Sequence, residues 1–402
     1  MLITDVVVVG GGPAGAAAAC TLARAGRQVT LVDKAAFPRD KFCGDGLTTG
    51  ALRLLEELGL RPGSVPSWQP VSDVEVRSPS GLTVALALPR GQGQFAAVAR
   101  RHELDRAVLD LARDAGAQVL DGHAATGAST HDDRVVVEVK GVGPVHARYA
   151  IGADGMWSPL RRYLGATEPG YRGEWHAFRQ YFTDVAPRAA HELFVWFEAD
   201  LLPGYVWSFP LAGGRANVGF GIQRGGKITT REMAKLWPEL LQRSHIRAVL
   251  GPDARPEAPH RAWPIPARID RVELSAGRAL FVGDAAAATD PLTGEGIAQA
   301  LLTGIRAAEA LLTAGPHRPE EAAASYQRHV RRELVADHHL SMLLIRALRH
   351  RKGARAALRV AGLTPWTRRN FARWLFEDYP RAVVATPRRW RRQLFTGPGA
   401  YR

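Results

Sequence analysis

Three glycines near the N-terminus have the spacing of a dinucleotide-binding turn. Gly10, Gly12 and Gly15 satisfy the pattern G-x-G-x-x-G, directly after a short run of β-branched residues that predicts a buried parallel strand. Residues 16–26 then predict a helix, so a pyrophosphate could approach the helix N-terminus through the glycine turn. Asp33 ends the next predicted strand, 23 residues after Gly10, which suits a carboxylate that accepts from ribose hydroxyls. Together these features predict a dinucleotide site.

A second glycine-rich segment indicates which dinucleotide binds. The stretch ALFVGDAAAATDPLTGEGI, residues 279–297, places Gly283-Asp284 after a predicted strand and another glycine-rich turn at the start of a helix. Asp284 can hydrogen-bond the hydroxyls of a ribityl chain. The backbone N–H groups of residues 294–296 can face the N1–C2=O edge of a flavin, where negative charge appears on reduction. This arrangement predicts a flavin.

Alternate aromatic residues occupy a predicted strand in the middle of the chain. In LPGYVWSFP, residues 202–210, the side chains of Tyr205, Trp207 and Phe209 share one face because side chains alternate along a strand. We expect the strand to end at Pro210, because proline cannot donate to a sheet ladder. No catalytic triad or metal-ligand cluster accompanies this stretch, and we expect no metal site.

The order of four motifs resembles a known fold. Arg101 opens the predicted helix RHELDRAVLDLARDAG, and Asp154-Gly155 ends the strand ARYAIGAD. With G-x-G-x-x-G before them and Gly-Asp-Ala after them, they resemble flavoproteins of the para-hydroxybenzoate hydroxylase fold over about residues 1–310. The resemblance implies tightly held FAD in an α/β protein: a Rossmann-like FAD-binding domain, an antiparallel-sheet substrate domain and a C-terminal helical region. The cofactor-binding residues expected are Gly10, Gly12, Ala14, Gly15, Asp33, Lys34, Cys43, Gly44, Arg101, Asp154, Gly155, Asp284, Pro291, Gly294, Gly296 and Ile297.

Two stretches resemble the geranylgeranyl reductase family more closely. They are RDKFCGDGL, residues 39–47, and LPGYVWSFP, whose core matches the family motif PxxYxWxFP. Pro203 stands two positions before Tyr205, whereas the proline of the family motif stands three positions before its tyrosine. The resemblance implies an FAD-dependent enzyme that saturates C=C double bonds of an isoprenoid chain on a lipid or quinone. Such a chain has almost no polar groups, so its site should be a long apolar tunnel with aromatic walls.

Two weak acids are candidate proton donors. An unpolarised alkene accepts hydride only if a proton reaches its other carbon. The resemblance places the Cys43 loop near the flavin ring, and both the Cys43 thiol and the Tyr205 phenol could donate. The sequence leaves that choice open, and Trp207 joins them as a catalytic-site candidate in the wall. No second G-x-G-x-x-G follows a strand, so NAD(P)H docks transiently or another electron carrier reduces the flavin.

Other enzymes share this fold, so the fold alone does not give the reaction. An FAD-dependent aromatic monooxygenase, or hydroxylase, is the main alternative. A flavin-dependent halogenase would carry an essential lysine near the flavin and a tryptophan-rich strand that ends in Ile-Pro. Here the strand ends in Phe209-Pro210. Lys34 and Lys41 belong to the dinucleotide segment and the loop after it, so neither is an obvious candidate for that lysine.

Positive charge is concentrated at the C-terminus. The net charge is +14, and the last 62 residues contain fifteen Lys or Arg against two acids. In WTRRNFARWLFEDYP, one helical face carries Phe371, Trp374 and Leu375, opposite Arg369 and Arg373. In PRRWRRQLF, four arginines surround two apolar residues: Arg388, Arg389, Arg391 and Arg392 around Trp390 and Leu394. Basic residues beside Trp and Leu suit a helix on an anionic membrane surface, while a tail packed over the body is the alternative. No nucleic-acid-reading motif accompanies the charge, so we expect no nucleic-acid partner.

Cysteine usage and segment order complete the expectations. The two cysteines, Cys20 and Cys43, form no disulfide framework, and we see neither a signal peptide nor a run of 18 apolar residues. We therefore expect a cytoplasmic enzyme, peripheral on the inner membrane face. The expected domains are FAD-binding (1–69, 98–165 and 273–315), substrate (70–97 and 166–272) and a C-terminal basic helical region (316–402).

Overall fold

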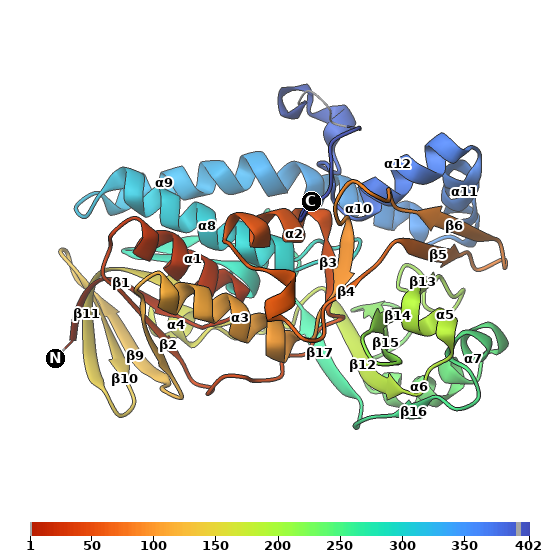
Figure 1. Cartoon of the computed structure of the whole chain (residues 1–402). Coiled ribbons are helices and arrows are strands. Elements are labelled where there is room, and N and C mark those ends of the chain that lie inside the picture. Colours follow the sequence, from red (N-terminus) through yellow and green to blue (C-terminus); the bar gives the residue numbers. More distant parts are fainter. Residues whose placement is uncertain (1, 391–394) are drawn as a thin grey trace.

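The chain begins in a mostly parallel β-sheet (Figure 1). The structure is a computed structural model, and it describes residues 2–390 and 395–402. The sheet runs in the order β18-β19-β11-β1-β2-β8. Its strands are β18 (Ser275–Ala276), β19 (Ala279–Phe281), β11 (Gly143–Gly152), β1 (Leu2–Val9), β2 (Val29–Asp33) and β8 (Gln118–Asp121). From β11 the antiparallel strands β10 (Val135–Val139) and β9 (Ala125–Thr130) extend it. The last four residues of β1 are all buried, as expected of a parallel strand covered on both faces.

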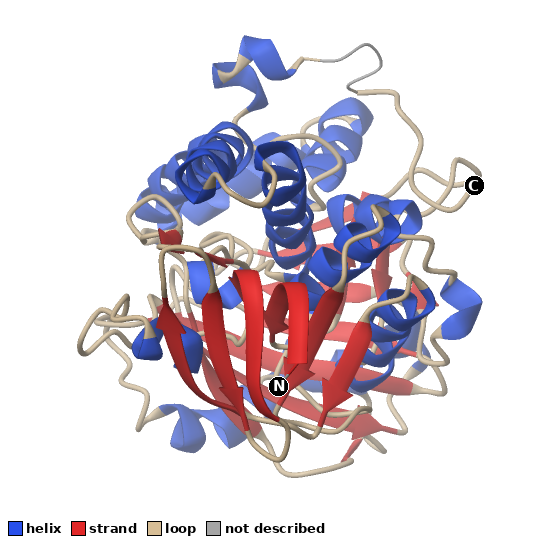
Figure 2. Ribbon diagram, turned by 90° about the vertical axis from the view of Figure 1, so that its left-hand side faces the viewer, coloured by secondary structure: helices blue, strands red, loops and turns tan. Residues whose placement is uncertain are grey.

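Helices gather along one side of this sheet, above its strands in Figure 2. They are α1 (Pro13–Arg24), α2 (Thr49–Glu57), α3 (Arg101–Asp114), α8 (Ile297–Ala314) and α9 (Pro319–Val330). Helix α8 packs on α1 so closely that a Cβ at Gly304 would lie 2.1 Å from the Ala14 carbonyl oxygen. Within the described residues, α8 is the one helix whose length and mean hydropathy suit a membrane span, but 72% of that span is buried inside the protein. Such burial is typical of a core helix.

A second, mostly antiparallel sheet occupies the other half of the molecule (Figure 1). Its strand order is β16-β12-β15-β14-β13-β5-β6, where β13 and β5 pair in parallel, and β17 also pairs with β12. The strands are β16 (Arg255–Pro256), β12 (Trp175–Thr183), β15 (Arg215–Gln223), β14 (Val206–Leu211), β13 (Leu193–Trp196), β5 (Asp73–Arg77), β6 (Thr83–Ala87) and β17 (Arg261–Ile265). An aromatic core that includes stacked Phe220 and Trp237 packs the sheet against α5 (Pro187–His191), α6 (Met233–Leu241) and α7 (Ser244–Leu250). Between the large sheets lie β3 (Gly46–Thr48), β4 (Gln69–Pro70) and β7 (Ala96–Val98). The domain limits drawn from the sequence stay a prediction.

Strand β14 corrects one expectation. It continues through Pro210 to Leu211, and Pro210 lies opposite Ala216 of β15. On its other side, β13 pairs with β14 only from Val206 to Ser208. Beyond that point β14 has a free side, where a missing N–H costs no ladder hydrogen bond. The prediction that the strand ends at Pro210 was therefore wrong by one residue.

The C-terminal region is helical and packs on the rest of the protein. After α9 come a π-helical turn (Arg331–Val335), α10 (Ala336–Leu348), α11 (Arg351–Gly362) and α12 (Pro365–Leu375). Buried side chains of α11 and α12 share an apolar core with β5 and β6. The final residues return to the body, where Ala400 bridges to Gln94 and Tyr401 packs edge-on against Trp68. Arg391, Arg392 and Leu394, part of the second basic cluster, lie outside the described residues.

Candidate functional site

One cavity of about 960 Å³ extends from the glycine-rich turn to helices α11 and α12. Most of the residues predicted for the site line it, although they come from segments far apart in the sequence: Gly10, Gly12, Ala14, Asp33, Lys34, Cys43, Gly44, Arg101, Asp154, Gly155, Tyr205, Trp207, Asp284, Pro291, Gly294, Gly296 and Ile297. Gly15 lies outside this lining. A Cβ there would lie 1.8 Å from the Gly10 carbonyl oxygen, so Gly15 serves the close packing of helix on turn.

The glycine turn leaves room for a dinucleotide at one end of the cavity. Gly10 has φ +110°, and a Cβ on it would lie 2.2 Å from the Ala153 carbonyl oxygen, so only glycine fits. The Asp33 carboxylate, at the end of β2, accepts from the N–H of Gly11 at 2.7 Å and of Ala35 at 2.8 Å. It therefore braces the turn, and it borders the cavity where a ribose would lie.

The loop before α8 is folded around one carboxylate. Asp290 accepts through Oδ1 from the N–H groups of Leu292 (3.0 Å) and Thr293 (2.9 Å). This folding brings Gly294, with φ +71°, and Gly296 to the cavity at the N-terminus of α8. The partial positive charge of a helix N-terminus suits the pyrimidine edge of a flavin.

Two predicted cofactor residues have their charged groups engaged by the protein. Asp154 accepts from the Ser158 hydroxyl at 2.5 Å and from the Leu160 N–H at 2.8 Å, and so caps α4 (Pro159–Tyr163). Arg101 donates to Asp105 through two nitrogens, at 2.6 and 2.9 Å. Both residues border the cavity, but these contacts hold its wall together.

Lys41 was set aside in the sequence but lies in the cavity. Its Nζ is 3.7 Å from an Asp284 carboxylate oxygen and 4.7 Å from the centre of the Trp263 ring. Burial lowers the pKa of the Lys41 ammonium. The loop that carries Lys41 folds back and borders the cavity. The sequence position of Lys41, in the loop after the second strand, does not predict this.

The cysteine loop lies directly on the aromatic strand. A Cβ at Gly44 or Gly46 would lie within 3.4 Å of the Phe209 ring. Burial raises the pKa of the Cys43 thiol above its ordinary value, an effect that Arg101 opposes. The two stretches that resemble the reductase family, residues 39–47 and 202–210, are thus in direct contact in the structure.

Three aromatic rings line the cavity in a row, as strand alternation predicts. The ring centroids of Tyr205 and Trp207 are 6.1 Å apart, and those of Trp207 and Phe209 are 6.0 Å apart. The Tyr205 hydroxyl donates to the Thr293 carbonyl of the loop before α8. Burial raises the pKa of Tyr205. A Cβ at Gly219 of β15 would lie 2.3 Å from the Trp207 ring, so that glycine makes room for the indole.

A buried polar cluster behind the cysteine loop was missed in the sequence. The Asn217 amide donates to the Cys43 carbonyl at 2.9 Å and to the Asp45 carboxylate at 2.8 Å. The Tyr181 hydroxyl donates to the same Asp45 oxygen at 2.6 Å, and Asn217 accepts from the Trp207 indole at 3.1 Å. Burial raises the pKa of Asp45. The cluster ties the cysteine loop to the aromatic strand, and its only sequence signal was the acid inside Gly-Asp-Gly.

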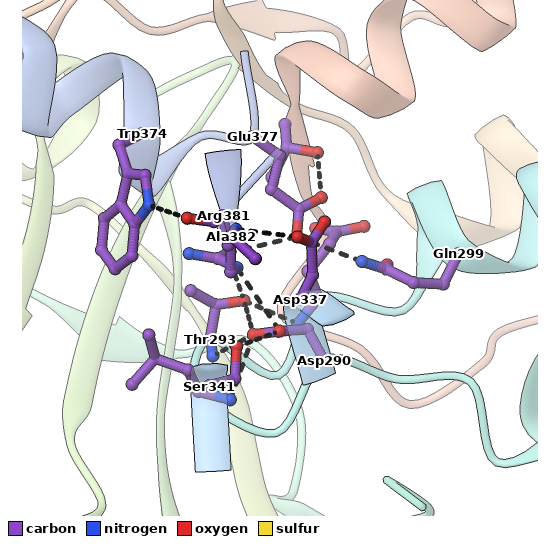
Figure 3. A network of polar contacts seen from close by, with 12 residues as sticks. Asp290, Thr293, Gln299, Asp337, Ser341, Trp374, Glu377, Arg381 and Ala382 are labelled. Atoms are coloured by element: carbon purple, nitrogen blue, oxygen red, sulfur yellow. Dashed lines mark hydrogen bonds and ion pairs between the residues drawn. The ribbon is translucent and has the colours of Figure 1, made fainter. Parts of the chain in front are cut away.

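A second missed network joins the C-terminal region to the loop before α8 (Figure 3). Arg381 is buried and donates to Glu377 and to the Thr293 hydroxyl, both at 3.1 Å, while its Nε lies 3.4 Å from Asp290. The Trp374 indole donates to the Arg381 carbonyl at 3.1 Å. The basic tail thus supplies a cation to a group of acids beside the cofactor loop.

The other end of the cavity is apolar. Its lining there comes from strands β5 and β13 of the second sheet, the residue after β13, and the C-terminal region: Val76, Leu193, Val195, Phe197, Leu344, Leu348, Ala357, Leu358, Phe371, Trp374, Leu375 and Phe376. The face of α12 that the sequence assigned to a membrane surface is therefore cavity wall. Arg373, on the opposite face, is buried and pairs with Asp378. Phe371, Trp374 and Leu375 are partly buried in this wall and do not form a wholly exposed face.

Known proteins match this chain over most of its length. A family model described as an FAD binding domain matches residues 3–337. Menaquinone reductase of Mycolicibacterium smegmatis is 35% identical over 374 residues, which are 85% of this chain and 84% of that protein. Digeranylgeranylglycerophospholipid reductase of Methanosarcina mazei is 32% identical over 318 residues, 76% of this chain and 74% of that one.

Solved structures share the fold. A geranylgeranyl bacteriochlorophyll reductase-like protein from Thermoplasma acidophilum has a TM-score of 0.81 at 21% identity, over 97% of this chain and all of that one. A halogenase mutant in complex with FAD has a TM-score of 0.73 at 20% identity, over 97% of this chain and 85% of that one. The predicted fold class and the FAD cofactor are confirmed by these matches together with the family model.

Proposed function

Because the chain belongs to the FAD binding domain family, and because relatives covering most of it are reductases, we propose that it is an FAD-dependent reductase of isoprenoid double bonds. The substrate class is a lipid or quinone that carries a prenyl chain. One observation carries the proposal: a single cavity continues from the dinucleotide turn, past the Tyr205–Trp207–Phe209 row, to an apolar end between β5, β13 and α10–α12. An aromatic monooxygenase has no need of so long an apolar extension.

The residues present fit FAD. The cradle at Gly10 would be filled by any Cβ, Asp33 stands at the end of β2, and the N-terminus of α8 meets the cavity. When bound there, FAD supplies the hydride for reduction of a C=C bond. Its own reduction needs NAD(P)H that docks transiently, or another electron carrier.

Cys43 is the better placed of the two proton donors. The Tyr205 hydroxyl already donates its hydrogen bond to the Thr293 carbonyl, and so serves to hold the loop. The Cys43 thiol keeps its proton at neutral pH because burial raises its pKa. After the proton leaves, the Arg101 guanidinium and the Asp45 N–H can stabilise the thiolate. Trp207 and Phe209 exclude water from that side of the cavity.

Peripheral binding to an anionic membrane surface belongs to the same proposal, since the substrates are lipids. Exposed cations and apolar side chains lie together in the C-terminal region. Arg388 is exposed beside Val384 and Trp390, whose exposed fractions are 85% and 61%. Each cation near such a surface contributes about 1 kcal/mol. Arg373, Arg381 and Arg389 are engaged in ion pairs with the body and do not contribute.

The reaction type is tested without oxygen. FAD-loaded protein, reduced chemically under anaerobic conditions, should convert a prenylated quinone to a product whose prenyl chain has gained two hydrogens. The gain is located in the chain by fragmentation in the mass spectrometer, after the ring has been reoxidised to the quinone. A monooxygenase or halogenase needs oxygen, so strict dependence on oxygen would overturn the proposal. The variant Cys43→Ala should lower turnover by about 10²-fold or more, the usual contribution of a positioned proton donor. Cys20→Ala removes a buried thiol of α1 and is the matched control.

A further inference from the structure

A second hollow of about 520 Å³ lies on the outer side of helices α11 and α12. Figure 1 shows these two helices at the edge of the molecule. Small residues of α11 line it, among them Ala356 and Ala357, together with the exposed Val360 and Trp366. The side chains of Val360 and Trp366 are both 61% exposed, so the hollow opens to the outside.

The hollow and the main cavity share a wall made of side chains. Ala357, Phe371 and Trp374 line both spaces. The rings of Phe371 and Trp374 are stacked, with centroids 5.7 Å apart and planes 29° apart. Both side chains are only partly buried, as expected of residues with free space on two sides. Rotation of these two side chains would join the two spaces without a change of the helices, and it would exchange the hydrogen bond of the Trp374 indole to the Arg381 carbonyl (3.1 Å) for an open passage.

The size of the main cavity requires such an exit for a long substrate. Pockets of roughly 300–1,000 Å³ hold one drug-sized ligand, and this cavity of about 960 Å³ takes FAD as well as the reacting part of the chain. The remainder of a polyprenyl chain must leave it through an apolar opening. The exposed side chains that line the outer hollow are apolar, and Leu363 at the end of α11 is 70% exposed. The same two helices carry exposed arginines, Arg359 on α11 and Arg368 and Arg369 on α12, whose positive charge suits the anionic headgroups of a bilayer.

We infer that the hollow between α11 and α12 is the portal through which the substrate's prenyl chain passes between the membrane and the flavin cavity. Phe371 and Trp374 form its gate. The inference rests on the proposed function, because it takes the isoprenoid chain as the occupant. It assigns that chain a direction: the reacting double bond lies beside Tyr205 and Trp207, and the distal part extends into the bilayer over α11 and α12.

The test compares two substrates in three proteins. The substrates are a quinone with a two-unit prenyl chain, and a quinone with a chain of nine units held in anionic vesicles. The variant Ala356→Trp places a large ring in the lining of the portal. The control Ala324→Trp places the same ring on an exposed alanine of α9, away from both hollows. Bound FAD and the melting temperature are measured for each protein, and Val360→Trp replaces Ala356→Trp if the latter does not fold.

We expect Ala356→Trp to lower turnover of the long-chain substrate at least tenfold, and to leave that of the short-chain substrate within twofold of the wild type. Ala324→Trp should change neither. If Ala356→Trp lowered the turnover of both substrates equally, or changed the turnover of neither, the portal would be overturned while the proposed function stands. Wild-type turnover of the short-chain substrate alone would also overturn it. If the wild-type protein reduced neither substrate, the proposed function itself would fail.

Discussion

Replacing Glu295 by glutamine should make the protein more stable at alkaline pH and leave its stability little changed at acid pH. Glu295 is 8% exposed, at the start of α8, where its Oε1 accepts from the Ala298 N–H at 2.7 Å. Glutamine keeps that acceptor and removes the charge. The groups that face Glu295 are the Glu377 carboxylate, the Arg381 guanidinium and the Tyr205 phenol. Acids outnumber cations in this cluster, so one carboxyl should hold a proton near neutral pH.

The size of the effect follows from the pKa. Burial, and then the neighbouring Glu377, raise the pKa of Glu295 from its ordinary 4.5 to about 8. An acid with a raised pKa in the folded state binds its proton more tightly there than in the unfolded chain. Its stabilising contribution is therefore complete below pH 4.5 and is lost as the pH rises to 8. Each pKa unit corresponds to about 1.4 kcal/mol, so the full loss is about 3–5 kcal/mol.

The assay is urea unfolding of wild type and Glu295→Gln at pH 5 and pH 9. The variant should gain under about 1 kcal/mol at pH 5 and about 3–5 kcal/mol at pH 9. Glu239→Gln removes one charge from an exposed position of α6 and should show no such pH dependence. A difference between wild type and Glu295→Gln that is the same at both pH values would refute the reasoning. It would mean that Glu295 is already ionised in the folded protein.

Two further predictions separate the structural arginines of the C-terminal region from its exposed ones. Arg373→Met leaves the buried Asp378 with Arg53 as its remaining partner and removes a donor to the Gly397 carbonyl. The free energy of unfolding, measured in urea, should therefore fall by about 3 kcal/mol, while binding to vesicles should not change. Arg388→Gln should leave unfolding unchanged and weaken binding to anionic vesicles about fivefold in a sedimentation assay at low salt, the equivalent of about 1 kcal/mol. The opposite assignment of effects would show that the exposed charge has no part in lipid binding.

Much of the cofactor site was predictable because its signals are local. Gly10 follows β1 directly, Gly15 lies in the first turn of α1, and Asp33 closes the next strand, so one short βαβ unit carries the whole pattern. The same holds for Tyr205 and Trp207, whose common face follows from strand alternation alone. In each case the residues that meet are neighbours in sequence or are fixed by a regular period.

Contacts between distant segments were not predictable in the same way. Asp45 meets Tyr181 and Asn217 only because β12 and β15 pair in one register and the cysteine loop crosses them. Arg381 reaches Asp290 through the return of the chain after α12, which no local pattern encodes. The sequence shows where the positive charges lie along the chain, but it does not show which of these side chains are buried.

The C-terminal region also accounts for how one fold can serve different chemistries. A halogenase shares the fold at a TM-score of 0.73, so the architecture leaves the substrate undetermined. In this chain, Trp374 of the cavity wall donates to the backbone of Arg381, and Arg381 holds Thr293. Thr293 in turn accepts from Tyr205, the first ring of the aromatic row. The apolar wall, the loop before α8 and the aromatic strand are therefore joined in one chain of hydrogen bonds.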